Sequence, residues 1–206
     1  WFNLALLGLL WAWLGEHAPP LRWLPSQSLA LFVVPTFLLG VSPIFVSDAL
    51  FWGAAVANAG AAALLACHLY TLWQRKKHLP LLAHFGLVIL SVHIIGALFI
   101  LWPNFWRWSA GTQLRIFFLH NFLLGWVSSV LLGVIMTFTI QWERRLEKII
   151  SVIWAAGVAV MLLALLGVGF IQFVPVSVST LLWIAAWSSV ALSMAGLLVL
   201  NRIIVK

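Results

Sequence analysis

Long apolar runs separated by short polar breaks dominate this sequence. A membrane-spanning helix needs about 20 mostly apolar residues, whereas a transmembrane β-strand alternates polar and apolar residues over about 10. The runs here do not alternate, so the pattern predicts helices and an all-α, polytopic transmembrane bundle that forms a single domain over residues 1–206. Seven spans are predicted, over residues 1–15, 28–47, 49–73, 80–102, 111–140, 149–172 and 177–203.

Two features of the first two predicted spans need a separate interpretation. Pro35 and Pro43 fall inside the second span, where a proline removes a backbone donor, so we expect a kinked helix there. The chain starts at Trp1 and enters an apolar run at once. We therefore expect a truncated or processed N-terminus, and we do not interpret residues 1–15 as a signal peptide.

Composition supports a membrane protein over the other classes. Hydrophobic residues make up 65% of the chain, charged residues only 7%, and the mean hydropathy is +1.14. Soluble domains carry about 45–50% apolar and about 25% charged residues, so a soluble domain, a disordered chain and a nucleic-acid binder are all excluded. A single cysteine, Cys67, excludes a disulfide framework and a multi-cysteine metal site. The expected surroundings are a lipid bilayer.

The basic residues predict the orientation of the chain. With seven spans, nine of the 11 lysines and arginines fall on one side of the membrane, and only Arg107 and Arg115 fall on the other. Because cytoplasmic loops are enriched in lysine and arginine, we expect the C-terminus in the cytoplasm and the N-terminus outside, with the protein in a bacterial inner membrane. The nine are Arg22, Arg75, Lys76, Lys77, Arg144, Arg145, Lys148, Arg202 and Lys206.

Ionisable residues inside spans are functional candidates, and here they are histidines. The chain has only four acidic residues, all predicted at turns or in loops, so a carboxylate-lined proton path and a two-carboxylate catalytic site have little support. We identify no catalytic residue. His17 and His78 are expected in loops. The candidates inside spans are His68, His84, His93 and His120.

The depths of these four histidines suggest two pairs. At about 1.5 Å of rise per residue, His93 and His120 reach nearly equal depth, and His68 and His84 do so near the inner face. Two imidazoles at one level are suited to hold a haem iron axially, so the pattern predicts one or two haems b. However, His84 and His93 are nine residues apart and point to opposite faces of one helix, so two haems would have to flank that helix. The alternative for each histidine is an interhelical hydrogen bond.

Residues 118–137, FLHNFLLGWVSSVLLGVIMT, resemble the histidine-bearing helix of two groups of proteins. One is the NnrS family of haem- and copper-containing membrane proteins, and the other is the set of short proteins similar to subunit I of haem-copper oxidases. The shared features are His120 followed five residues later by Gly125, and then Trp126 and Val127. The second histidine of the oxidase-like motif is replaced by Phe118.

Residues 79–90, LPLLAHFGLVIL, are similar to a second segment of the NnrS family through His84 and Gly86. The resemblance thus covers residues 79–137, and it implies haem and also copper at His84 and His120. The depth argument instead pairs His93 with His120. Both pairings remain open, so His120, His93 and His84 are candidates for metal binding, and His68 joins them for haem binding alone.

These observations lead to one leading function and two alternatives. We expect a haem-binding membrane subunit that carries electrons from a quinone or a periplasmic donor to a partner subunit, within nitrogen-oxide or oxygen respiration. No glutamate or tyrosine lies near these histidines inside a span, so we expect the chain to be part of an oxidoreductase complex, not catalytic alone. The first alternative is a cofactor-free anchor or assembly subunit of a larger membrane complex. The second, a small transporter, has less support because no internal repeat is evident.

Overall fold

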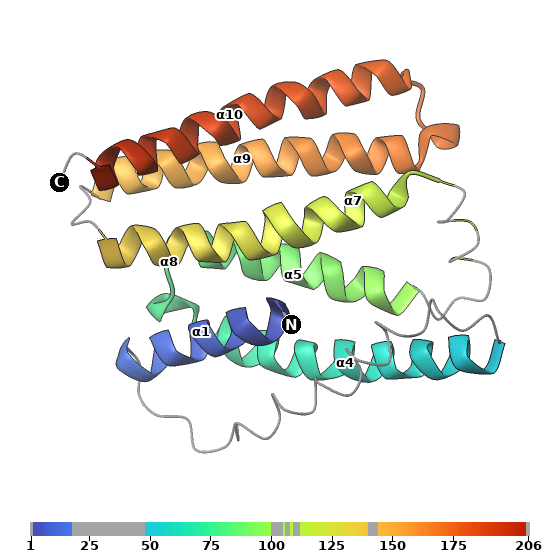
Figure 1. Cartoon of the computed structure of the whole chain (residues 1–206), viewed down its shortest axis with the longest axis horizontal. Helices are drawn as coiled ribbons and strands as arrows, with labels where there is room; N and C mark the ends of the chain where they lie inside the picture. The colour runs from blue at the N-terminus through green and yellow to red at the C-terminus, as the bar shows by residue number, and fades with distance from the viewer. Residues whose placement is uncertain are drawn as a thin grey trace. The chain divides into compact units, whose positions relative to one another are not determined.

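The structure is a computed structural model that describes residues 2–17, 48–99, 105, 108, 112–139 and 144–204. Throughout these residues the regular elements are helices, which confirms the all-α prediction (Figure 1). Five of them are long and apolar enough to cross a membrane. This length and composition indicate an integral membrane protein.

The five span-length helices agree with the last five predicted spans. Two are α4 (Asp48–Gln74) and α5 (Leu81–Phe99). The next span is continuous through three elements, α7 (Leu114–His120), η3 (Asn121–Ser128) and α8 (Ser129–Thr139). The last two are α9 (Arg144–Gly169) and α10 (Val178–Ile204).

The first two predicted spans have different outcomes. Residues 2–15 of the first predicted span form most of helix α1 (Phe2–His17), whose apolar part, Leu6–Gly15, is shorter than the other spans. The predicted span over residues 28–47, with its proline kink, lies outside the described residues. Seven spans and a cytoplasmic C-terminus therefore stay predictions.

One predicted boundary was wrong by about five residues. The polar stretch before the sixth span was expected to be a loop, but α9 already begins at Arg144. Glu147 stands in its first turn, where a carboxylate interacts favourably with the positive end of the helix dipole. Apolarity marks where a helix enters hydrocarbon, whereas backbone hydrogen bonding continues the same helix beyond it. Hydropathy alone therefore misses such a polar first turn.

The chain forms two compact units. The first comprises residues 1–79 and 91–106, and the second comprises residues 80–90 and 107–206. The division falls within α5, which is itself one unbroken helix.

In the first unit, two tryptophans of α1 donate hydrogen bonds to one side chain of α4 and to one carbonyl in the turn that follows α4. The indole Nε1 of Trp11 donates to Nδ1 of His68 at 3.1 Å, and that of Trp13 donates to the carbonyl of His78 at 2.8 Å. His78 ends a short 3₁₀ turn, η2 (Lys76–His78), and is exposed there. Nearer the N-terminus of α4, the Asn58 amide donates to the Ala97 carbonyl at 2.9 Å. Hydrogen bonds thus connect three helices inside a largely apolar unit.

In the second unit, α9 and α10 run side by side along their lengths (Figure 1). Glycines permit this close approach: a Cβ placed on Gly157 would lie 3.0 Å from Leu192, and one on Gly167 would lie 3.1 Å from Leu181. The opposite face of α10 is apolar and open, with Trp183 and Trp187 about two-thirds exposed. Such a face is suited to contact with lipid.

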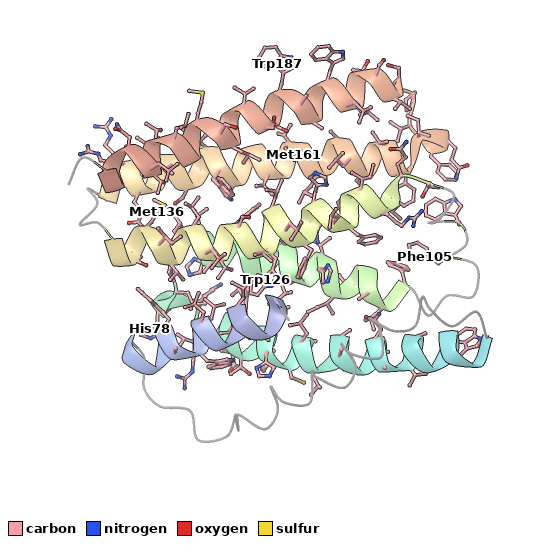
Figure 2. The ribbon with its side chains drawn as sticks, in the orientation of Figure 1. His78, Phe105, Trp126, Met136, Met161 and Trp187 are labelled. Carbon is pink, nitrogen blue, oxygen red and sulfur yellow. The ribbon has the colours of Figure 1, made fainter. Side chains whose placement is uncertain are left out.

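The α7–η3–α8 span packs in the same unit against α9 and against the first half of α5. Leu114 lies beside Gly169, and the Trp154 indole of α9 donates to the Ser129 hydroxyl at 2.9 Å. Toward α5, a Cβ on Gly86 would lie 2.8 Å from Val130, and one on Gly125 would overlap with Ile89. Trp126, labelled in Figure 2, is completely buried next to Gly86. These contacts give the register of the span against both neighbours.

Candidate functional site

His120 is the last residue of α7 and stands directly before η3. Its ring nitrogen Nδ1 lies 2.8 Å from the carbonyl oxygen of Ile116, one turn earlier on the same helix. A carbonyl only accepts, so Nδ1 must carry the proton. In its neutral form the ring then keeps its lone pair on Nε2, and the side chain is half-buried. Histidines that bind metals commonly donate their other ring nitrogen to a carbonyl or carboxylate in this way.

The segment after His120 has an unusual backbone. Residues Asn121–Ser128, the element η3, form a π-helix, which has a wider turn than an α-helix. Such turns are rare in proteins overall, but those that occur are often at functional sites. Two serine hydroxyls bind carbonyls five residues earlier: Ser128 binds that of Leu123 at 2.8 Å, and Ser129 binds that of Leu124 at 3.1 Å. The sequence motif around His120 did not predict this π-helix.

His68 has the opposite ring chemistry. It is almost fully buried, at 1% exposure, and its Nδ1 accepts the hydrogen bond from Trp11. The two rings meet edge to face with centroids 6.0 Å apart. Because Nδ1 uses its lone pair as an acceptor, the neutral ring carries its proton on Nε2, where no lone pair is left for a metal. This geometry matches the interhelical hydrogen bond that the sequence left open as an alternative.

His84 and His120 are both in the second unit, but at different levels. His84 is two residues from Gly86, which packs against Val130, so His84 lies near the level of residue 132. That level is about 12 residues from His120, or about 18 Å along the span. The structure therefore does not bring these two histidines to one iron.

His93 belongs to the first unit and is half-buried on α5. It stands nine residues after His84 on one continuous helix, so the two project from opposite faces, as the sequence predicted. Of the two histidines expected in loops, His78 is in η2, and His17 ends α1, where its side chain lies outside the described residues. Nowhere in the described part of the chain do three or more histidine, cysteine or acidic side chains gather as a metal site.

Sequence reasoning missed one polar residue of this region. Asn121 follows His120, is completely buried at 0% exposure, and belongs to the first turn of η3. An amide in the middle of an apolar run was the available signal, but only titratable residues were considered as candidates.

Five apolar, span-length helices and histidines within them define the class: a helical membrane protein with a candidate ligand at His120. Comparison with known proteins does not narrow this class further. No protein-family model matches the chain, and neither the curated proteins nor the solved structures compared with it include a significant match.

Proposed function

We propose that this chain is a haem-binding integral membrane subunit that transfers electrons, with His120 as an axial ligand of a haem b. The observation that carries the proposal is the hydrogen bond from His120 Nδ1 to the Ile116 carbonyl, which directs the lone pair to Nε2. This is the ring state that an iron ligand needs. The side chain is half-buried and therefore not fully enclosed by the described residues.

The second axial ligand in this proposal is His93, which the sequence puts at a similar membrane depth. His84 is less suited to the same iron because of its different level in the second unit. His68 is less suited to a second haem because its Nδ1 is occupied by Trp11. The ring chemistry therefore favours one haem over two. The family resemblance also implies copper, and metal analysis of the purified chain tests for it.

When bound, the haem supplies the one-electron chemistry. The chain supplies the imidazole ligand, holds its ring orientation through Ile116, and keeps water away with apolar side chains. In this proposal the subunit has seven spans and a cytoplasmic C-terminus in a bacterial inner membrane. It accepts electrons from a quinone or a periplasmic donor and passes them to a partner subunit of an oxidoreductase complex in nitrogen-oxide or oxygen respiration.

The test is a reduced-minus-oxidised absorption spectrum of the detergent-purified chain, with a pyridine haemochrome assay and metal analysis. We expect haem b bands that disappear in His120→Ala and in His93→Ala. His84→Ala should retain them, and His78→Ala, which changes an exposed histidine of η2, serves as the matched control.

Two outcomes would contradict parts of the proposal. Loss of the bands in His84→Ala but not in His93→Ala would replace His93 by the pairing that the family resemblance implies. A well-folded chain without haem or copper would overturn electron transfer.

The alternative function is then a cofactor-free anchor or assembly subunit. Its specific support is the hydrogen bond from Trp11 to His68, because an interhelical hydrogen bond is what this alternative expects of an intramembrane histidine.

A further inference from the structure

Asn121 is the most unusual polar residue in the second unit. Its side chain has 0% exposure, and neither its amide nitrogen nor its amide oxygen hydrogen-bonds to any group among the described residues. A primary amide has two donor hydrogens and an acceptor oxygen. Leaving all of them unpaired inside a membrane protein is costly, because no bulk solvent reaches them.

The backbone at the same residue is also unusual. Asn121 begins the π-helix, and its backbone N–H is shared between the carbonyls of Phe117 and Phe118. Each carbonyl oxygen has two lone pairs, so it can accept a second hydrogen bond beside the one from this N–H. An unpaired amide and a shared backbone donor therefore occur within one turn.

The residues of α9 at the level of Asn121 are apolar. Two contacts bracket it along α9: Leu114 beside Gly169, and Ser129 with Trp154. In this antiparallel register, Asn121 lies at the level of Met161 and Leu162, both of which are buried. Neither side chain offers a strong hydrogen-bonding group, and no described residue is a hydrogen-bond partner of the amide.

We propose that Asn121 binds an internal water molecule between η3 and α9. Full burial of the side chain limits the ligand to a small molecule, and the amide requires one that both donates and accepts hydrogen bonds. Water meets both conditions, and buried waters typically make about three hydrogen bonds to polar groups that lack protein partners. The amide of Asn121 and the carbonyls of Phe117 and Phe118 provide these partners. The water also stabilises the widened turn, since inserted waters are a recognised cause of irregular helices.

The chain contains its own reporters for this water. It has three methionines, and methionine reacts readily with hydroxyl radicals. Met161 is at the level of Asn121 and is 7% exposed, Met136 is 2% exposed and far along the span, and Met194 is 59% exposed on α10. Met161 and Met136 are both labelled in Figure 2. X-ray radiolysis converts a bound water into hydroxyl radical where it sits, so an internal water oxidises its neighbour.

The experiment is radiolytic footprinting of the purified full chain, with oxidation of each methionine measured by mass spectrometry. In the wild type, we expect Met161 to be oxidised several-fold faster than Met136. In Asn121→Leu, which keeps the size but removes the amide, Met161 should fall to the rate of Met136. Asn121→Ser retains a hydroxyl for the water and should keep Met161 reactive, and so should the control Ser129→Ala.

Equal oxidation of Met161 and Met136 in the wild type would overturn the proposal, whether or not any variant folds. Undiminished oxidation of Met161 in a folded Asn121→Leu would also overturn it, because the amide would then not hold the water. The proposal does not depend on haem: the footprint reports on Asn121, whereas the absorption spectrum reports on His120.

Discussion

His68 and His120 show how the same side chain acquires opposite properties from one hydrogen bond each. His120 donates from Nδ1 to a carbonyl of its own helix, whereas His68 accepts at Nδ1 from an indole of another helix. The first arrangement directs a lone pair outward on Nε2, and the second places a proton there. A histidine inside a span is therefore a ligand candidate only when its other nitrogen has the right partner.

This contrast leads to a prediction for Trp11→Phe. The change removes the donor to a buried imidazole, so we expect the free energy of unfolding to fall by about 1 kcal/mol, in the range of membrane hydrogen bonds. Equilibrium unfolding in mixed detergent micelles measures it. Trp183→Phe is the matched control, because Trp183 is exposed on α10 and its change should have little effect.

A second part of the prediction distinguishes the two roles of His68. Because Trp11 acts through a structural bond, Trp11→Phe should leave any haem absorbance unchanged. A loss of haem bands in this variant, with the fold intact, would show that His68 takes part in ligation.

At the scale of the element, glycines decide how closely the first half of α5 approaches the η3–α8 helix. Gly86 and Gly125 were prominent in the sequence as parts of histidine motifs. In the structure they admit Val130 and Ile89, respectively, to the backbone of the facing helix. The glycine of a His-x₄-Gly pattern thus has a packing explanation that requires no cofactor.

Gly125→Ala is therefore predicted to be destabilising. The added Cβ would overlap with the branched side chain of Ile89, and overpacking of this kind costs about 1–3 kcal/mol. Gly196→Ala in α10 is the control: nothing lies within 4 Å of the added Cβ there, and alanine favours a helix by about 0.5–1 kcal/mol. Unfolding titrations of both variants should shift in opposite directions. Equal shifts would contradict the close packing of α5 on η3.

The elements differ in how far hydropathy predicts them. The spans from α4 to α10 follow from the apolar runs, because about 20 apolar residues have few other stable states in a bilayer. The early start of α9 and the π-helix η3 did not follow. Both depend on backbone hydrogen bonding, which average hydropathy does not report.

At the scale of the whole molecule, the basic residues predict sidedness. Lys77 is one of the nine basic residues expected in the cytoplasm, and Arg115 is one of the two expected outside. Both side chains are exposed. Cys67→Ser gives a cysteine-free chain for labelling. With a membrane-impermeant maleimide on intact cells, we expect Arg115→Cys to react and Lys77→Cys to react only after permeabilisation. The reverse pattern would invert the predicted topology, and labelling of both in intact cells would contradict the charge argument.

The sequence alone determined the environment and the helical class of this protein. Composition and the length of apolar runs are properties of the chain itself, and a bilayer accepts few folds that satisfy every backbone hydrogen bond. The sequence also narrowed the candidate chemistry to four histidines, because no acidic residue is predicted inside a span.

Only the tertiary structure decided what each polar group in the interior binds. Whether a ring nitrogen donates, accepts or remains available depends on which helix lies opposite, as Trp11 shows for His68. The complete burial of the Asn121 amide at the start of the π-turn likewise became visible only in the structure. Hydrogen bonds act over about 3 Å, so helices that are adjacent in space but distant in sequence determine them.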